Sequence, residues 1–129
     1  MLLDTSVLIA AERGRLDLDE VVVRVAGRVV ISAVTASELF LGVQRRPPGL
    51  AQARGDRDVT AILTVLPVIP VDLDVARVHA ALRAELGDRG LALGAHDMLM
   101  GATALAHDFA LAALGRAFDR VPGLVVHHW

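Results

Sequence analysis

The chain has 129 residues, of which 54% are hydrophobic, and its 13 basic and 15 acidic side chains give a formal net charge of −2. This composition supports a packed core and argues against a disordered chain and against a generally basic nucleic-acid binder. Cysteine is absent, which excludes disulfides and zinc–thiolate sites. All 13 of the Lys and Arg residues are arginine, which excludes lysine Schiff-base chemistry. Carboxylates, histidine, serine, threonine and arginine remain for chemistry.

The predicted elements alternate between short apolar strands and helices. We expect strands at 2–3, 29–31, 68–71, 109–112 and 124–126. Helices are expected at 5–13, 17–27, 32–44, 58–66, 72–86 and 96–106. The caps of the second and third helices are left open between Asp17 and Asp19 and between Ser32 and Thr35.

The expected strands are nearly continuous apolar runs rather than alternating ones. Together with the intervening helices, this pattern predicts a parallel sheet covered by helices on both faces. We expect residues 1–129 to form one domain. Ligands of such sheets bind beyond the carboxyl ends of the strands, so acidic residues at that edge are the candidates for a functional site.

No targeting or membrane-spanning segment is predicted. Asp4 and Glu12 interrupt the N-terminal apolar stretch, whereas a signal peptide has a basic region followed by an unbroken apolar one. No stretch approaches the roughly 20 apolar residues that cross a bilayer. We therefore expect a cytoplasmic protein that does not associate with membranes.

Three acidic residues fall near the expected carboxyl edge. Asp4 follows the first strand, Glu38 lies one turn into the helix after the second strand, and Asp97 opens the helix at 96–106. Taken singly, Asp4 also fits a helix N-cap and Asp97 an acid favoured by the helix dipole. Glu38 shares a helical stripe with Val34 and Leu41, and alone it also fits a solvated residue at the edge of that stripe.

Taken together, the three acids predict a metal site. Carboxylates gathered in one pocket repel each other and raise each other's pKa unless a cation is present. Mg²⁺ or Mn²⁺ suits a site made only of oxygen ligands. Such an ion polarises a phosphoryl oxygen and activates water as a nucleophile, so Asp4, Glu38 and Asp97 are the candidate catalytic and metal-binding residues.

Four segments carry a resemblance to a known family. They read LLDTSVLI at 2–9, SELFLGV at 37–43, GAHDMLMGATALA at 94–106 and FDRVPGL at 118–124, with a tryptophan at the end of the chain. In this order they resemble the motifs of the PIN-domain family, and specifically of its VapC-like ribonuclease toxins. The resemblance extends over essentially the whole chain.

The resemblance implies a three-layer α/β/α sandwich with a central, mostly parallel sheet. It implies a Mg²⁺- or Mn²⁺-dependent endoribonuclease that acts as the toxin of a VapBC-type toxin–antitoxin pair. The metal-binding acids of the family correspond to Asp4, Glu38 and Asp97. An RNA substrate, a VapB-like antitoxin that masks the site and a homodimer are implied as well. With water as the nucleophile, the products would carry a 5′-phosphate and a 3′-hydroxyl.

The chain departs from the family after the strand expected at 109–112. Many members carry Thr-x-Asp or Thr-x-Asn there, which adds a group to the metal site, but this chain has Ala113-Leu114-Gly115. Asp119 is the nearest acid that could substitute. The departure leaves open whether the site holds one ion or two. It also keeps a second interpretation, a weakly active or inactive PIN-like interaction module.

Other features have simpler explanations. Asp72 and Asp74 follow a short strand, as in haloacid-dehalogenase-like phosphatases, but those enzymes need a lysine and helix capping by Asp72 fits better. His127 and His128 fit an exposed C-terminus better than a metal site. His96 fits packing or capping better than a contact to Asp97 or to a substrate.

An arginine cluster at Arg45, Arg46, Arg54 and Arg57 has two interpretations. It binds RNA phosphates or an acidic segment of a partner, or it is a solvated loop partly neutralised by nearby aspartates. Near the first acid, the Thr5 and Ser6 hydroxyls are expected to support the Asp4 carboxylate or a metal-bound water.

Overall fold

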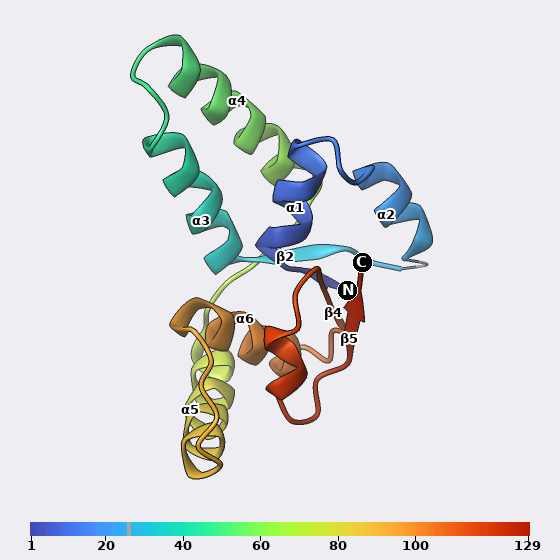
Figure 1. The fold of residues 1–129 in the computed structure, drawn as a ribbon, viewed down its shortest axis with the longest axis vertical. Coiled ribbons are helices and arrows are strands. Elements are labelled where there is room, and N and C mark those ends of the chain that lie inside the picture. Colours follow the sequence, from blue (N-terminus) through green and yellow to red (C-terminus); the bar gives the residue numbers. More distant parts are fainter. Residues whose placement is uncertain (26) are drawn as a thin grey trace.

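The computed structural model describes residues 1–25 and 27–129. Its sheet has five strands, all paired in parallel in the order β3-β2-β1-β4-β5. They are β1 (Leu2–Leu3), β2 (Val30–Ser32), β3 (Val68–Ile69), β4 (Leu111–Ala113) and β5 (Val126–His128). Helices cover both faces of this sheet (Figure 1), which confirms the predicted α/β/α sandwich.

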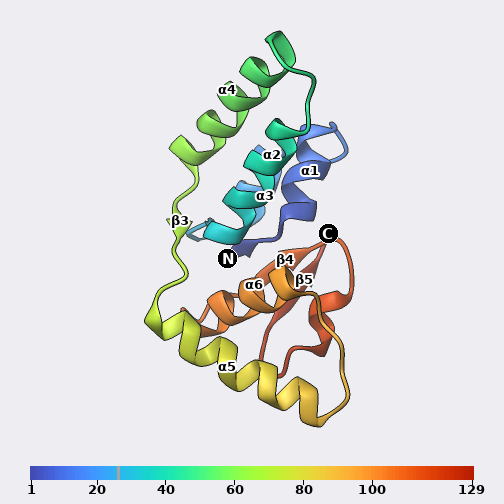
Figure 2. The same cartoon turned by 90° about the vertical axis from the view of Figure 1, so that its left-hand side faces the viewer.

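The helices fall into two groups on opposite sides of the sheet (Figures 1 and 2). One side carries α1 (Thr5–Glu12), α2 (Leu18–Arg24), α3 (Ala33–Gln44) and α4 (Leu50–Val65). The other side carries α5 (Leu73–Asp88), α6 (Ala95–Ala106) and the short 3-10 helix η1 (Ala117–Arg120). Figure 2 shows α3 and α4 as an antiparallel hairpin that rises away from the sheet.

Successive residues of a strand point to opposite faces of the sheet and belong to two different apolar clusters. Leu2, Val30 and Leu111 pack with α5 and α6, whereas Leu3 and Ile31 pack with α1, α3 and α4. All five side chains are completely buried. Fully burying such a side chain stabilises the fold by about 1.5–3 kcal/mol, so short strands suffice when both faces are covered.

Side-chain caps set the helix starts as the sequence predicts. Asp17, Ser32 and Asp72 accept hydrogen bonds from backbone N–H groups in the first turns of α2, α3 and α5. Asp17 rather than Asp19, and Ser32 rather than Thr35, fills the cap position. Each cap stabilises its helix by about 1 kcal/mol.

Several predicted boundaries were wrong. β4 and β5 begin two residues later than expected, and the helix predicted over 17–27 ends at Arg24, with residue 26 outside the described residues. The helix predicted from 58 begins at Leu50, directly after Gly49 at φ 95°. Gly55 lies inside this helix and leaves room for Arg46, because a Cβ there would lie 3.0 Å from Arg46 Nη1.

The strand order determines which residues meet at the carboxyl edge of the sheet. β1 lies in the centre, between β2 and β4, and the Asp4 N–H donates to Ala112 O at 2.9 Å. Asp4 therefore follows β1 where α3 leaves β2 and where β4 ends. Within the described residues, no helix combines the length and the apolar character needed to span a membrane.

Candidate metal centre

Asp4 is the most enclosed of the three predicted acids, with 9% of its surface exposed. It caps α1, and its Oδ2 accepts hydrogen bonds from the Ser6 N–H at 3.2 Å and from the Ser6 hydroxyl. Ser6 Oγ in turn accepts from the Leu114 N–H at 3.3 Å. The cap interpretation is thus correct, and Ser6 also ties the Asp4 carboxylate to the end of β4.

Glu38 lies on α3 and is half-buried. Its Oε1 is 2.9 Å from Nδ1 of His96, which lies in the first turn of α6, so the contact joins two helices across the site. The expected stripe with Leu41 was wrong, because the Leu41 side chain is 45% exposed whereas Leu39 and Val43 are buried. Glu38 sits beside the buried stripe, as the alternative interpretation proposed.

Asp97 lies in the first turn of α6 and is half-buried. Burial raises the pKa of its carboxyl above the ordinary value, the charges of Asp4 and Glu38 raise it further, and His96 lowers it. Asp97 thus experiences both other predicted acids as negative charges. The fold has brought residues from three separate sequence segments into one electrostatic environment.

These acids interact through their charges rather than through direct contacts. Within residues 1–25 and 27–129, no three histidine, cysteine, aspartate or glutamate side chains come together closely enough to form a metal-binding group. The His96 ring lies beside them, and its side chain is 59% exposed. The arrangement is a cluster of acids around one end of α6, with Asp4 and Glu38 each held by a neighbour.

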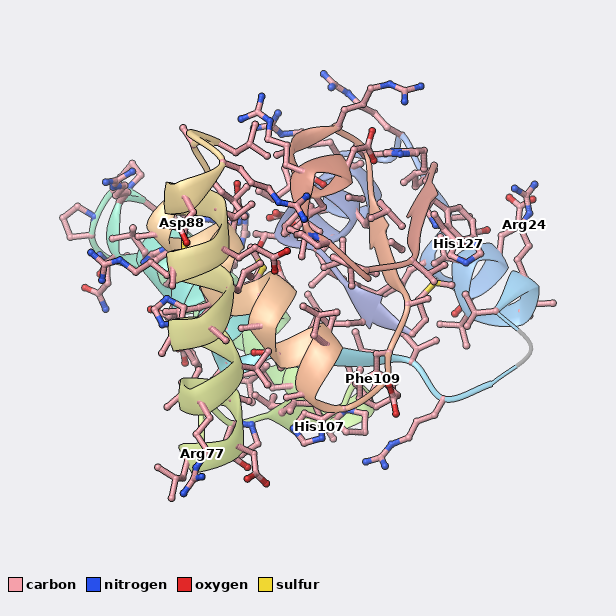
Figure 3. The ribbon with its side chains drawn as sticks, turned by 90° about the horizontal axis from the view of Figure 1, so that it is seen from below. Arg24, Arg77, Asp88, His107, Phe109 and His127 are labelled. Carbon is pink, nitrogen blue, oxygen red and sulfur yellow. The ribbon has the colours of Figure 1, made fainter. Side chains whose placement is uncertain are left out.

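Asp119 lies outside this cluster. Its carboxylate is 2.8 Å from His128 Nε2 and accepts from Arg116 Nη1 at 3.3 Å. His127 and His128 are consecutive residues of β5, so their side chains point to opposite faces of the sheet. Figure 3 shows His127 far from Arg77 of α5. The two histidines therefore do not form a joint metal site.

A groove of about 460 Å³ runs from this cluster between α1, α3 and α4. Glu38 and His96 line one end, Leu8 and Val59 line the floor, and Arg45 lies at the other end of α3. Leu41 of α3 lines the groove and is exposed. The groove could not be predicted from the sequence, because it forms only where the α3–α4 hairpin packs beside α1.

The arginine cluster does not behave as a single loop. Arg46 donates to Glu12 of α1 at 2.6 Å and packs against Gly55 of α4, so it locks the hairpin to α1. Arg54 and Arg57 belong to α4. Arg13, Arg45 and Arg46 line the groove together with Glu12 and Asp58, and Arg46 is paired with Glu12. The arginines therefore exceed these two acids by one charge, in contrast to Glu38 at the near end.

Comparison with known proteins connects this geometry to a family. A family profile described as PIN domain matches residues 1–124. The VapC ribonuclease Y4jK of Sinorhizobium fredii is 31% identical over 137 aligned residues, covering 100% of this chain and 97% of the relative. Ribonuclease VapC5 of Mycobacterium tuberculosis is 37% identical over 107 residues, covering 79% and 73%.

Solved structures show the same architecture. The DNA-bound VapBC structure from Salmonella typhimurium matches with a TM-score of 0.89 and 26% identity, covering 99% of this chain and 96% of that one. The FitAcB structure from Neisseria gonorrhoeae matches with a TM-score of 0.83 and 26% identity, covering 98% and 96%.

Proposed function

The chain belongs to the PIN-domain family, and we propose that it is a metal-dependent endoribonuclease that acts as the toxin of a VapBC-type pair. The relatives named ribonuclease VapC support this function. The observation that carries it is that acids on three separate elements act on one another: Asp4 caps α1, Glu38 lies on α3 and Asp97 lies on α6, where burial and then the charges of Asp4 and Glu38 raise the pKa of Asp97. Residues 1–129 act as one domain in this proposal, and an RNA substrate gives it a cytoplasmic site of action.

Asp4, Glu38 and Asp97 are the residues that would hold Mg²⁺ or Mn²⁺. Carboxylate oxygen is the ligand that these ions prefer, and three such groups in one field favour a divalent cation. Mg²⁺ keeps several of its waters, so carboxylates that share its hydration shell need not touch each other. The chemistry supplied by the ion is activation of water and neutralisation of charge on the phosphate.

Neighbouring side chains hold two of the three carboxylates in place. Ser6 holds the Asp4 carboxylate, and His96 holds Glu38 beside the first turn of α6. Such neighbours orient the groups that contact an ion. Water attacks the phosphodiester in this account, so the RNA 2′-hydroxyl does not react and each cut leaves a 5′-phosphate and a 3′-hydroxyl.

Cleavage of total RNA tests the function. The wild-type protein should cut RNA with Mg²⁺ or Mn²⁺ and stop in excess EDTA, and the mapped fragments should begin with 5′-phosphates. Fragments ending in 2′,3′-cyclic phosphates, or full activity in EDTA, would contradict the mechanism. Circular dichroism of the Asp4→Asn and Asp97→Asn proteins would establish that inactive variants remain folded.

A VapB-like antitoxin is the proposed protein partner, since the similar solved structures include DNA-bound VapBC. The groove suits a peptide with apolar side chains, a basic group towards Glu38 and an acidic group towards Arg45. Leu41→Glu places a charge in this groove and should abolish co-purification with the antitoxin while RNA cleavage persists. Val23→Glu on α2, at a position 79% exposed, is the matched control.

A homodimer is also part of the proposal. Exposed apolar side chains surround the edge strand β3, namely Val65, Val68, Val71 and Leu73. An exposed apolar patch at a sheet edge is a surface suited to a second copy of the chain. Light scattering should give twice the chain mass for the wild type and the monomer mass for Val65→Glu, and a monomeric wild type would refute the dimer.

The second candidate function is a catalytically inactive interaction module. Gly115 favours it, because this position lacks the group that many family members contribute to the metal site. Antitoxin binding without RNA cleavage at any Mg²⁺ or Mn²⁺ concentration would support this alternative over the nuclease.

A further inference from the structure

A second polar cluster lies along the same edge of the sheet as the three acids. It consists of Arg116, Asp119 and His128, with Asp119 bridging the other two at 3.3 and 2.8 Å. The Arg116 side chain is 81% exposed, whereas those of Asp119 and His128 are 37% and 33% exposed. Arg116 is therefore the member most accessible to a ligand, and the other two form its base.

The strand register places this cluster near Asp4. Ala113 of β4 pairs with His128 of β5, and Leu3 of β1 pairs with Ala112, so Asp4 follows in the same row as Ala113 and His128. Neighbouring strands lie about 4.8 Å apart, which puts the Asp4 and His128 backbones about 10 Å apart. Only the small Ala113 side chain stands between them in this row.

The pairing of His128 with Ala113 also determines to which face of the sheet the His128 side chain points. In-register residues of a parallel sheet point to the same face, and Ala113 belongs to the apolar cluster that includes α6. His128 therefore points to the face on which Asp97 opens α6. The neighbouring His127 pairs with Ala112, which belongs to the other apolar cluster, so His127 points to the opposite face.

A chain of hydrogen bonds connects Asp4 to the segment that carries Arg116. The Leu114 N–H donates to Ser6 Oγ, and Ser6 donates to Asp4 Oδ2. Arg116 is two residues beyond Leu114, a span of at most about 7 Å. Its long side chain can therefore reach a phosphate group adjacent to the one that the acids would process.

The chemistry of the cluster fits a phosphate. RNA carries one negative charge per nucleotide, and cationic side chains that contact phosphates position the strand. The guanidinium group of arginine matches phosphate oxygens with two parallel N–H donors. Asp119 contacts a single nitrogen of Arg116, which leaves the remaining donors of the guanidinium for a ligand.

We infer that Arg116 binds a phosphate of the RNA next to the scissile phosphodiester, with Asp119 and His128 as its positioning residues. The inference rests on the proposed nuclease function and adds a substrate contact to it. In this role Asp119 orients Arg116. It does not replace the metal-site group that is absent at Gly115.

RNA binding tests this contact directly. The readout is fluorescence anisotropy of a labelled RNA that the wild type cleaves, measured over a salt series with Arg116 variants built on the inactive Asp97→Asn protein. Arg116→Gln should weaken binding about fivefold to tenfold and reduce the slope of log affinity against log salt by about one. Arg116→Lys should restore part of the affinity, because it keeps the charge without the paired donors.

Arg28→Gln is the matched control. It removes the same charge from an exposed arginine just before β2, at the opposite edge of the sheet, and should leave the affinity unchanged. Equal affinity of Arg116→Gln and the parent protein would overturn the inference. A wild type that neither binds nor cuts RNA would instead refute the proposed function.

Asp119→Asn and His128→Gln test the positioning roles in the otherwise wild-type enzyme. Both should raise KM severalfold while kcat stays within about twofold. Mn²⁺ affinity should not change, and circular dichroism should show a folded protein. Loss of Mn²⁺ binding in Asp119→Asn would make Asp119 a metal ligand and would contradict the assignment.

Discussion

Two stretches of the same sheet edge treat their carboxylates in opposite ways. Beyond β1, Asp4 is buried, and within residues 1–25 and 27–129 it accepts side-chain hydrogen bonds only from the N–H and hydroxyl groups of Ser6. After burial, the charge of Asp4 is the next largest cause that raises the pKa of Asp97. Beyond β4 and β5, Asp119 is exposed and lies between Arg116 and His128. One stretch concentrates negative charge and the other neutralises it.

The difference indicates what each stretch can bind. A carboxylate already paired with an arginine and a histidine gains little from a metal ion, whereas acids that repel each other gain a great deal. The β1 side is therefore suited to a divalent cation. The β4–β5 side presents a guanidinium, which suits an anion such as a substrate phosphate.

The largest expected effect is on the rate of RNA cleavage, which should distinguish Asp4 and Asp97 from Asp119. Asp4→Asn and Asp97→Asn should each reduce RNA cleavage at least about a hundredfold, as the loss of a charged group at a reacting centre does. Asp119→Asn should reduce it at most about tenfold, because it acts through Arg116. Gel assays of cleavage rate measure both, and equal losses at the three positions would break the comparison.

A smaller effect is expected where the two stretches are joined. Ser6→Ala removes the hydroxyl between Leu114 and Asp4 and should lower the cleavage rate about tenfold, as supporting hydrogen bonds at metal sites do. The free energy of unfolding should fall by about 1 kcal/mol, measured by urea denaturation. Thr60→Ala, at an exposed position of α4, controls for hydroxyl loss, and a Ser6→Ala enzyme of normal rate would show that Asp4 needs no support.

The smallest effect concerns stability without metal. The raised pKa of Asp97 means that the native state binds this proton more tightly than the unfolded chain does. Its stabilising contribution is full below the unfolded pKa near 3.9 and is lost as the pH rises through the raised value. In EDTA, Asp97→Asn should therefore melt up to about 2 °C above the wild type at neutral pH.

The same comparison near pH 3 supplies the control, since the wild-type carboxyl is protonated there and the advantage of the variant should disappear. A variant that melts below the wild type at neutral pH would mean that the Asp97 charge stabilises the native state, contrary to the account.

Local signals in the sequence were enough to predict the architecture and the edge that carries the acids. The caps at Asp17, Ser32 and Asp72 act within one turn of their helices, so they can be recognised without the fold. The apolar strands predicted a covered parallel sheet, and the sheet in turn predicted that Asp4 and the start of α3 meet at one edge.

The contacts that tune the site depend on tertiary packing and could not be predicted. The Glu38–His96 contact joins residues 58 positions apart, and the Ser6–Leu114 bond joins residues 108 apart. Leu41 was expected beside Glu38 in a buried stripe, but the α3–α4 hairpin leaves that side of α3 facing an open groove. Arg46 occupies the space beside Gly55 of α4, a contact that also depends on the packed hairpin.

The central claim is that Asp4, Glu38 and Asp97 act together on one divalent ion. Isothermal titration of Mn²⁺ into the metal-free protein tests it most directly, with Asp4→Asn, Glu38→Gln, Asp97→Asn and Asp119→Asn titrated alongside the wild type. The account predicts binding by the wild type and by Asp119→Asn, and a loss of at least about tenfold in affinity in each of the other three variants. Undiminished Mn²⁺ affinity in any of those three variants would contradict it.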